Sequence, residues 1–186
     1  MGALAVTSVT YDVHDAAVRP MTADTSTAPT YGAWVDLPGV QQVQVNPTFI
    51  TAELKGDAKV LDNRSKTSAM DISCNYAQSD LNVLKTVLGG TLTATASTKQ
   101  SYILLGTNST PYIAFAFAVN DVTLGIGNIL FNARKCKMTG GNLFDQQTDQ
   151  YGARSLQMQA IATVSNDQLI EIVYNSTVVP IATAFT

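Results

Sequence analysis

The single histidine of the chain, His14, is the first residue to consider for catalysis, because two aspartates lie beside it. A Ser–His–Asp arrangement would have to use His14 together with an acid such as Asp12 or Asp15. The Gly-x-Ser-x-Gly turn that presents a nucleophilic serine in one large class of hydrolases does not occur in the sequence. We therefore expect His14 to be a surface residue rather than a catalytic base.

Hydrolytic and metal-dependent chemistry also lack a local pattern. Hydrolysis by paired acids needs two carboxylates that converge on one site, and the chain has only two glutamates, Glu53 and Glu171, among scattered aspartates. Cys74 and Cys136 lie far apart in the sequence, and His14 alone cannot complete a metal site with them. The sequence predicts no catalytic residues, no cofactor and no metal site, and we expect a protein that is not an enzyme.

Two other groups of side chains leave alternatives open. Cys74 and Cys136 both lie in strand-like segments, which favours buried thiols, with a single disulfide as the alternative. Arg134, Lys135 and Lys137 form the one basic cluster of the sequence. Such a cluster is typical of a solvated or salt-bridged face, and the alternative is a contact with acidic groups of a neighbouring subunit.

The composition narrows the class of protein. Of the 186 residues, 13% are charged and the net charge is −3, whereas about 25% charged residues is usual. This balance argues against a nucleic-acid binder that works through a basic patch. The shortage of charge indicates that other protein covers much of the surface, because interface cores are depleted in charge. We expect a single domain over residues 1–186.

The sequence also carries no pattern typical of membrane targeting. Residues 1–6 have neither the basic region nor the long apolar stretch of a secretory signal. No apolar run approaches the ~20 residues that a membrane-spanning helix needs. We therefore expect no membrane anchor.

Most of the sequence alternates apolar and polar residues with period two, which predicts half-buried β-strands. Residues 68–76 and residues 156–164 are clear examples. In residues 112–119 both faces are apolar, one with large side chains and the other nearly all alanine. This pattern predicts a central strand whose alanine face is approached closely by another element.

The alternation changes phase between residues 129 and 138. Phe131 and Ala133 share one phase, while Cys136 and Met138 share the other. An extra residue in the strand would produce this change, so the sequence predicts a β-bulge near Arg134 and Lys135.

Residues 79–88 break the strand pattern and predict one short helix. Leu81, Leu84 and Leu88 fall on one face and are expected to pack it, and Ser79 can cap the first turn. A helix of this length must pack against a sheet to be stable.

The fold class that follows is mainly β. We predict a β-sandwich or barrel of about ten strands with one flanking helix. Residues 20–31, rich in threonine, alanine and proline, are expected to form an extended loop or arm.

Three short motifs follow one another in the first half of the chain. They are Trp34-Val35-Asp36-Leu37-Pro38-Gly39-Val40, then Ala52-Glu53-Leu54-Lys55-Gly56-Asp57, then Asp80-Leu81-Asn82-Val83-Leu84 with Leu88-Gly89-Gly90. In this order they resemble the major tail tube proteins of long-tailed bacteriophages. The resemblance covers roughly residues 30–100.

The resemblance implies a β-sandwich with one flanking helix, similar to the type VI secretion tube protein. It implies a virion structural protein, assembled in the host cytoplasm, that forms hexameric rings stacked as a hollow tail tube. Its partners would be further copies of itself and other tail proteins at the tube ends. The phage genome would pass through the lumen without specific binding, along polar strands such as residues 42–44 or 67–75.

The resemblance also implies a long hairpin loop near residues 55–68 that reaches the adjacent ring. The tip of this hairpin carries the densest group of mixed charges in the chain, namely Asp57, Lys59, Asp62, Arg64 and Lys66. We expect these residues to make inter-ring contacts, and the alternative is a solvated hairpin tip.

Two other functions remain open from the sequence. One is a type VI secretion-like tube subunit. The other is a free, non-enzymatic β-sandwich binding module such as a lectin or adhesin, for which a secretion signal would be expected.

Overall fold

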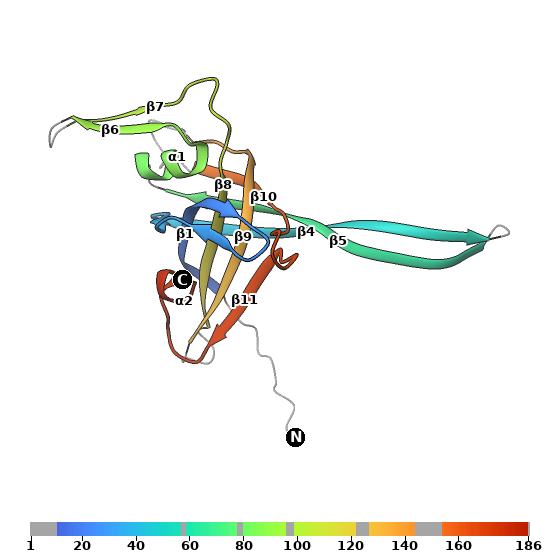
Figure 1. Ribbon diagram of the computed structural model, residues 1–186. Coiled ribbons are helices and arrows are strands. Elements are labelled where there is room, and N and C mark those ends of the chain that lie inside the picture. The colour runs from blue at the N-terminus through green and yellow to red at the C-terminus, as the bar shows by residue number, and fades with distance from the viewer. Residues whose placement is uncertain are drawn as a thin grey trace, which may run out of the picture.

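The computed structural model describes residues 11–56, 59–77, 80–95, 99–121, 127–143 and 154–185, and it confirms a mainly β fold (Figure 1). The strands are β1 (Tyr11–Asp24), β2 (Pro29–Tyr31), β3 (Val35–Asp36), β4 (Val40–Gly56), β5 (Lys59–Tyr76), β6 (Thr91–Thr95), β7 (Lys99–Ile103), β8 (Tyr112–Asp121), β9 (Asn128–Gly140), β10 (Arg154–Ala160) and β11 (Ile170–Asn175). Two short helices accompany them, α1 (Leu81–Leu88) and α2 (Ile181–Ala184).

Nine of the described strands form one antiparallel sheet, and seven of them follow the order β2-β1-β8-β9-β10-β5-β4. The other two are β3, which pairs with β1, and β11, which pairs with β9 beyond the end of β10. β6 and β7 form a separate hairpin. The order of the described strands ends at β2 and β4, so the sheet is open and the predicted closed barrel is not formed.

The main core lies on one face of this sheet, and its residues come from most of the strands. Phe115 of β8, Tyr76 of β5 and Leu156 of β10 are all almost completely buried and belong to one cluster. Burial alternates along β10 from Arg154 to Ala160, as its period-two pattern predicts.

The opposite face of β8 is covered by the C-terminal segment. Ala116 and Ala118 are buried against Ile181 and Phe185, which lie in and just after α2. The predicted close approach to the alanine face is therefore confirmed. Alanine permits this approach because no longer side chain separates α2 from the strand.

The β-bulge predicted near Arg134 and Lys135 is confirmed. Ile113 of β8 pairs with Cys136 of β9, while Phe115 pairs with Ala133. β9 therefore has one residue more than β8 over this interval. The extra residue returns Cys136 to the core face that Ala133 also occupies.

Helix α1 begins at Leu81, later than the predicted start at Ser79, and its cap is Asp80. The Asp80 carboxylate accepts a hydrogen bond from the backbone N–H of Asn82 at 2.8 Å. Aspartate and serine are comparable caps, and here Asp80 has the extended backbone that a cap requires, with φ −122° and ψ 131°. Gly89 ends the helix with φ 78°, in the region that favours glycine.

The face of α1 that is most buried differs in part from the predicted leucine face. Val83, Leu84 and Val87 are each at most 2% exposed. Leu88 is partly buried and packs against the main core, whereas Leu81 is partly exposed. Leu84 is therefore the predicted packing residue that the core encloses most fully.

Residues 20–31 are mostly strand rather than a loop or arm, and the long hairpin predicted near residues 55–68 is present with most of that interval in strands. Residues 20–31 form the hairpin of β1 and β2 around a turn in which the Thr25 hydroxyl donates to the Ala28 carbonyl at 2.8 Å. Threonine favours strands, and its frequency in this segment explains why strand pairing replaces an arm. The interval 55–68 is strand up to Gly56 and again from Lys59, because β5 pairs with β4 over nearly its whole length.

Candidate functional site

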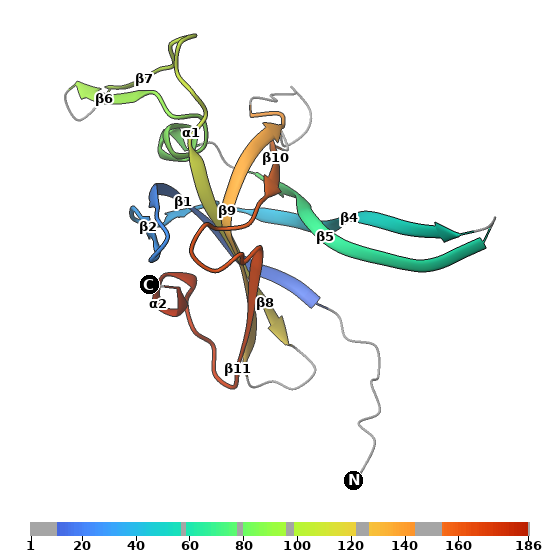
Figure 2. The same ribbon diagram turned by 45° about the vertical axis from the view of Figure 1, so that its right-hand side comes forward.

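The β4–β5 hairpin projects far beyond the body of the protein, away from the β6–β7 hairpin (Figures 1 and 2). Its pairing runs from Val40 opposite Tyr76 to Gly56 opposite Lys59. Near the body, Tyr76 and Cys74 anchor it in the main core. Residues 46–53 of β4, in the projecting part, are all exposed.

The residues predicted for inter-ring contact lie along this hairpin. Asp57 falls outside the described residues, and Lys59 and Asp62 lie on β5, with side chains that the structure does not describe. Arg64 and Lys66 are exposed. Lys66 lies 3.7 Å from Asp167 of the same chain, with both side chains at least 76% exposed, and such pairs contribute little to stability.

Sequence analysis missed two large apolar residues on the hairpin. Phe49 is 59% exposed and Ile50 is 63% exposed. They are adjacent on β4, so they project from opposite faces of the hairpin. The signal in the sequence was that two apolar residues in succession interrupt the alternation of the strand.

Other exposed large apolar residues lie at several further places among the described residues, including Tyr112 and Val164. Ile103, Leu104 and Leu105 lie at and after the end of β7, Ile172 and Tyr174 lie on β11, and Val178 precedes α2. Contiguous exposed apolar surface is typical of protein interfaces.

The outward face of β4, β5 and β10 is polar and nearly uncharged. Residues paired across the three strands form rows, of which Gln44–Ser73–Gln157 and Asn46–Asp71–Gln159 are the clearest. Asp71 is the one charged residue in these two rows. Its carboxylate accepts hydrogen bonds from Gln159 at 3.0 Å and from Thr48 at 3.1 Å.

Two residues of the basic cluster form salt bridges within the chain, which confirms the prediction of a solvated or salt-bridged face. Lys135 lies 2.7 Å from Asp24, and both side chains are at most 13% exposed. Arg134 lies 2.6 Å from Glu171. The ammonium of Lys137 lies 5.6 Å from the ring centroid of Tyr112.

Replacing Asp24 with asparagine is expected to lower the free energy of unfolding by about 2–3 kcal/mol, because the nearly buried ammonium of Lys135 would lose its counter-charge. The hydrogen bond from Lys135 holds the pKa of Asp24 below its ordinary value. This stabilisation is therefore complete above about pH 4 and is lost as the pH falls through the lowered pKa. Urea unfolding between pH 7 and pH 2 measures both effects.

Asp167→Asn is the matched control for that experiment, since the pair it removes is exposed. We expect it to change stability by less than about 0.5 kcal/mol at any pH. An Asp24→Asn variant as stable as Asp167→Asn at neutral pH would contradict the role of the Asp24–Lys135 pair.

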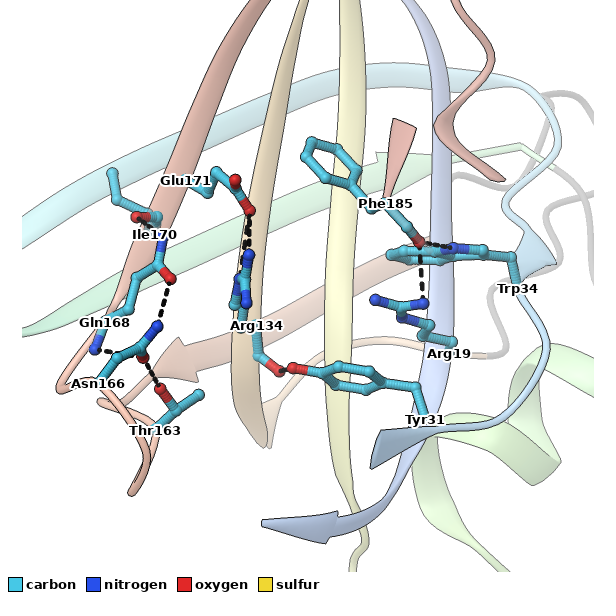
Figure 3. Close-up of polar contacts among 10 residues, drawn as sticks. All are labelled: Arg19, Tyr31, Trp34, Arg134, Thr163, Asn166, Gln168, Ile170, Glu171 and Phe185. Atoms are coloured by element: carbon cyan, nitrogen blue, oxygen red, sulfur yellow. Dashed lines mark hydrogen bonds and ion pairs between the residues drawn. The ribbon is translucent and has the colours of Figure 1, made fainter. Parts of the chain in front are cut away.

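A second polar group lies where the β1–β2 hairpin meets β9 and the C-terminal segment (Figure 3). The Tyr31 hydroxyl donates to the Arg134 carbonyl at 3.0 Å. Arg19 and the Trp34 indole both donate to the Phe185 carbonyl, at 3.0 and 3.1 Å. Burial lowers the pKa of the Arg19 guanidinium.

Arg19 could have been suspected from the sequence, because it directly follows the apolar run Ala16-Ala17-Val18. A charge beside such a run is unusual for a buried strand. Its contacts could not have been predicted, since Trp34 and Phe185 are far from it in the sequence.

The residues considered for catalysis do not form a catalytic arrangement in the described structure. His14 is exposed. Partial burial and the nearby Asp15 raise the pKa of Asp36. Among the described contacts, none joins either of these two carboxyl groups to a nucleophilic side chain. No group of three or more histidine, cysteine, aspartate or glutamate side chains suitable for a metal occurs among the described residues.

Cys74 and Cys136 are buried, free thiols, which confirms the prediction of unpaired cysteines. Burial raises the pKa of Cys74 to about 12 and raises the pKa of Cys136 as well. Both thiols therefore stay protonated and unreactive near neutral pH.

Among the described residues, no helix has the length and apolar character needed to cross a membrane.

Comparisons with known proteins found similarity to solved structures. No family model matches the sequence, and no curated protein matches it. The chain is similar to a structure described as the anti-feeding prophage cap, a tube terminating cap. The match covers 91% of this chain and 95% of that chain, at 10% identity and a TM-score of 0.39. A likeness of this extent does not by itself establish a shared fold.

Proposed function

We propose that this protein is a virion structural subunit that self-assembles into hexameric rings, stacked as the hollow tail tube of a long-tailed bacteriophage. The motifs at residues 34–57 and 80–90 support this proposal through their resemblance to tail tube proteins. The observation that carries it is the projecting β4–β5 hairpin with Phe49 and Ile50 exposed.

The hairpin is difficult to explain in a protein that acts alone. A two-stranded hairpin in water is only marginally stable, and exposed strand edges tend to pair with other chains. A neighbouring subunit would cover Phe49 and Ile50. In a stack of rings the hairpin would reach the adjacent ring, with Asp57, Lys59, Asp62, Arg64 and Lys66 as the proposed inter-ring contacts.

The polar face of β4, β5 and β10 is the proposed lining of the lumen. DNA that slides through a tube must not be held by its phosphates, and basic residues would hold it through counterion release. The rows around Gln44 and Asp71 offer amide and hydroxyl groups and a single carboxylate. This face is thus suited to letting DNA pass without specific binding.

The remaining parts of the proposal follow from assembly. The protein would be made and assembled in the host cytoplasm and would reside in the virion tail, with other tail proteins at the tube ends. We propose no catalytic function, no cofactor and no membrane anchor. A type VI secretion-like tube subunit is the nearest alternative, since it would assemble in a similar way.

Light scattering over a range of protein concentrations tests the proposal. We expect the mean mass to rise from the subunit mass of 19.8 kDa to large polymers as the concentration increases. The reason is that each subunit presents several apolar surfaces to its neighbours. A protein that stays monomeric at every concentration would contradict assembly and favour the binding module.

A further inference from the structure

A polar pocket of about 590 Å³ lies between the β1–β2 hairpin, β9, β11 and the end of the C-terminal segment. Its polar lining includes Arg19, Tyr31, Asn132, Arg134 and Glu171. Figure 3 shows all of these except Asn132, with Trp34 and Phe185 beside Arg19. Nothing in the proposed assembly accounts for this pocket.

Arg19 is the main unexplained residue of the pocket. It is 6% exposed, and its guanidinium carbon lies 3.9 Å from the ring centroid of Tyr31 and 4.3 Å from that of Trp34. One terminal nitrogen donates to the Phe185 carbonyl, but Nε has no hydrogen-bond partner among the described residues. Among the described residues, no carboxylate lies within ion-pair distance of Arg19.

A buried arginine without a counter-charge is unusual. Buried charges in proteins are generally paired, because removing an ion from water is costly. The two rings offset part of this cost through cation–π attraction. The Nε donor is enclosed and has no partner among the described residues, so a ligand in the pocket would reach it through a small shift of the Arg19 side chain.

Asn132 supplies a second unsatisfied group in the same pocket. It is 1% exposed, and no described residue forms a hydrogen bond with its Oδ1 atom. Asn132 lies on β9, opposite Glu171 of β11 and Ala116 of β8. The lining of the pocket therefore holds one acceptor at Asn132 and one donor at Arg19 that have no partner among the described residues.

The charges that line the pocket limit the net charge of a ligand that could bind there. Arg134 and Glu171 form an ion pair at 2.6 Å and neutralise each other. Among the described residues, Arg19 is left with a single uncompensated positive charge. A ligand with one negative charge matches this balance, whereas a dianion would bring a second negative charge close to Glu171.

We propose that this pocket binds a carboxylate whose neighbouring group carries an N–H donor. The carboxylate would accept from Nε of Arg19, and the N–H would donate to Oδ1 of Asn132. A free small molecule could supply this chemistry, and so could an acidic or carboxy-terminal group of a second copy of the chain. The proposal stands apart from tube assembly, because the named lining residues of the pocket all belong to one chain.

Fluorescence of Trp34 tests the proposal directly. Trp34 is the single tryptophan of the sequence, and its ring lies against Arg19. In dilute protein, N-acetylglycinate is expected to change the emission in a saturable way. Acetate, which lacks the N–H, should bind about tenfold more weakly. Neutral N-acetylglycinamide, at the same concentration and ionic strength, should have no effect.

Two variants assign the response to the named atoms. Asn132→Leu should weaken the binding of N-acetylglycinate about tenfold and leave the binding of acetate unchanged. Arg19→Lys keeps the positive charge but loses Nε, so it should weaken the binding of both ligands. Circular dichroism checks that each variant is folded, and Asn132→Leu still tests the pocket if Arg19→Lys does not fold.

Raising the protein concentration distinguishes the two sources of the carboxylate. If a second copy supplies it, the response to N-acetylglycinate should disappear in concentrated protein, because the pocket is already occupied. If a free molecule supplies it, the response should persist. The absence of any saturable response in both dilute and concentrated wild-type protein would overturn the proposal, and so would an unchanged response in folded Asn132→Leu.

Discussion

Replacing Phe49 and Ile50 together with serine is expected to weaken assembly strongly while the subunit stays folded. The two side chains are 59% and 63% exposed in the single chain, so the fold does not depend on burying them. In an assembly they would be covered, and full burial of one such side chain is worth about 1.5–3 kcal/mol. Loss of both should raise the concentration needed for assembly by about 100-fold or more.

Light scattering measures this change, with circular dichroism to verify the fold. The matched control is Phe49→Leu with Ile50→Val, which keeps both positions apolar and should assemble near the wild-type concentration. A double serine variant that assembles as readily as the wild-type protein would show that the hairpin is not part of a subunit contact.

Placing a carboxylate in the buried face of α1 should have the second large effect. Val87 is 0% exposed and belongs to the main core. Val87→Asp would bury a charge without a partner, and such changes belong to the class that costs more than about 4 kcal/mol. That loss is a large part of the 5–15 kcal/mol by which domains are usually stable.

Leu81→Asp is the control for that experiment. Leu81 is the first residue of α1 and is only partly buried, and a carboxylate there lies at the positive end of the helix dipole. We expect its cost to be about 1 kcal/mol or less. Thermal unfolding compares the two variants. Equal destabilisation by both would mean that the helix packs on the leucine face predicted from the sequence.

The features that could be predicted from the sequence are those set by neighbouring residues. The bulge at Arg134 and Lys135 follows from a change of phase within one strand. The covered alanine face follows from the alternation in residues 112–119. The start of α1 was misplaced because Ser79 and Asp80 are both good caps, and local preference does not distinguish them.

Other features depend on contacts between distant segments. Residues 55–68 have the charges and turn residues of a loop, but pairing with β4 along the hairpin makes most of them strand. The complete burial of Val83 on α1 is set by how the helix meets β1, β3 and β8. The pocket around Arg19 joins β1, β9, β11 and the segment ending at Phe185, and no pattern within any one segment indicates that these meet.

Negative-stain electron microscopy of concentrated protein tests the central claim most directly. We predict hollow tubes with a regular axial repeat and with hexameric rings in end view. Isolated compact particles without a central channel at every concentration would contradict the proposed function. Rings that never stack would contradict the inter-ring role of the β4–β5 hairpin.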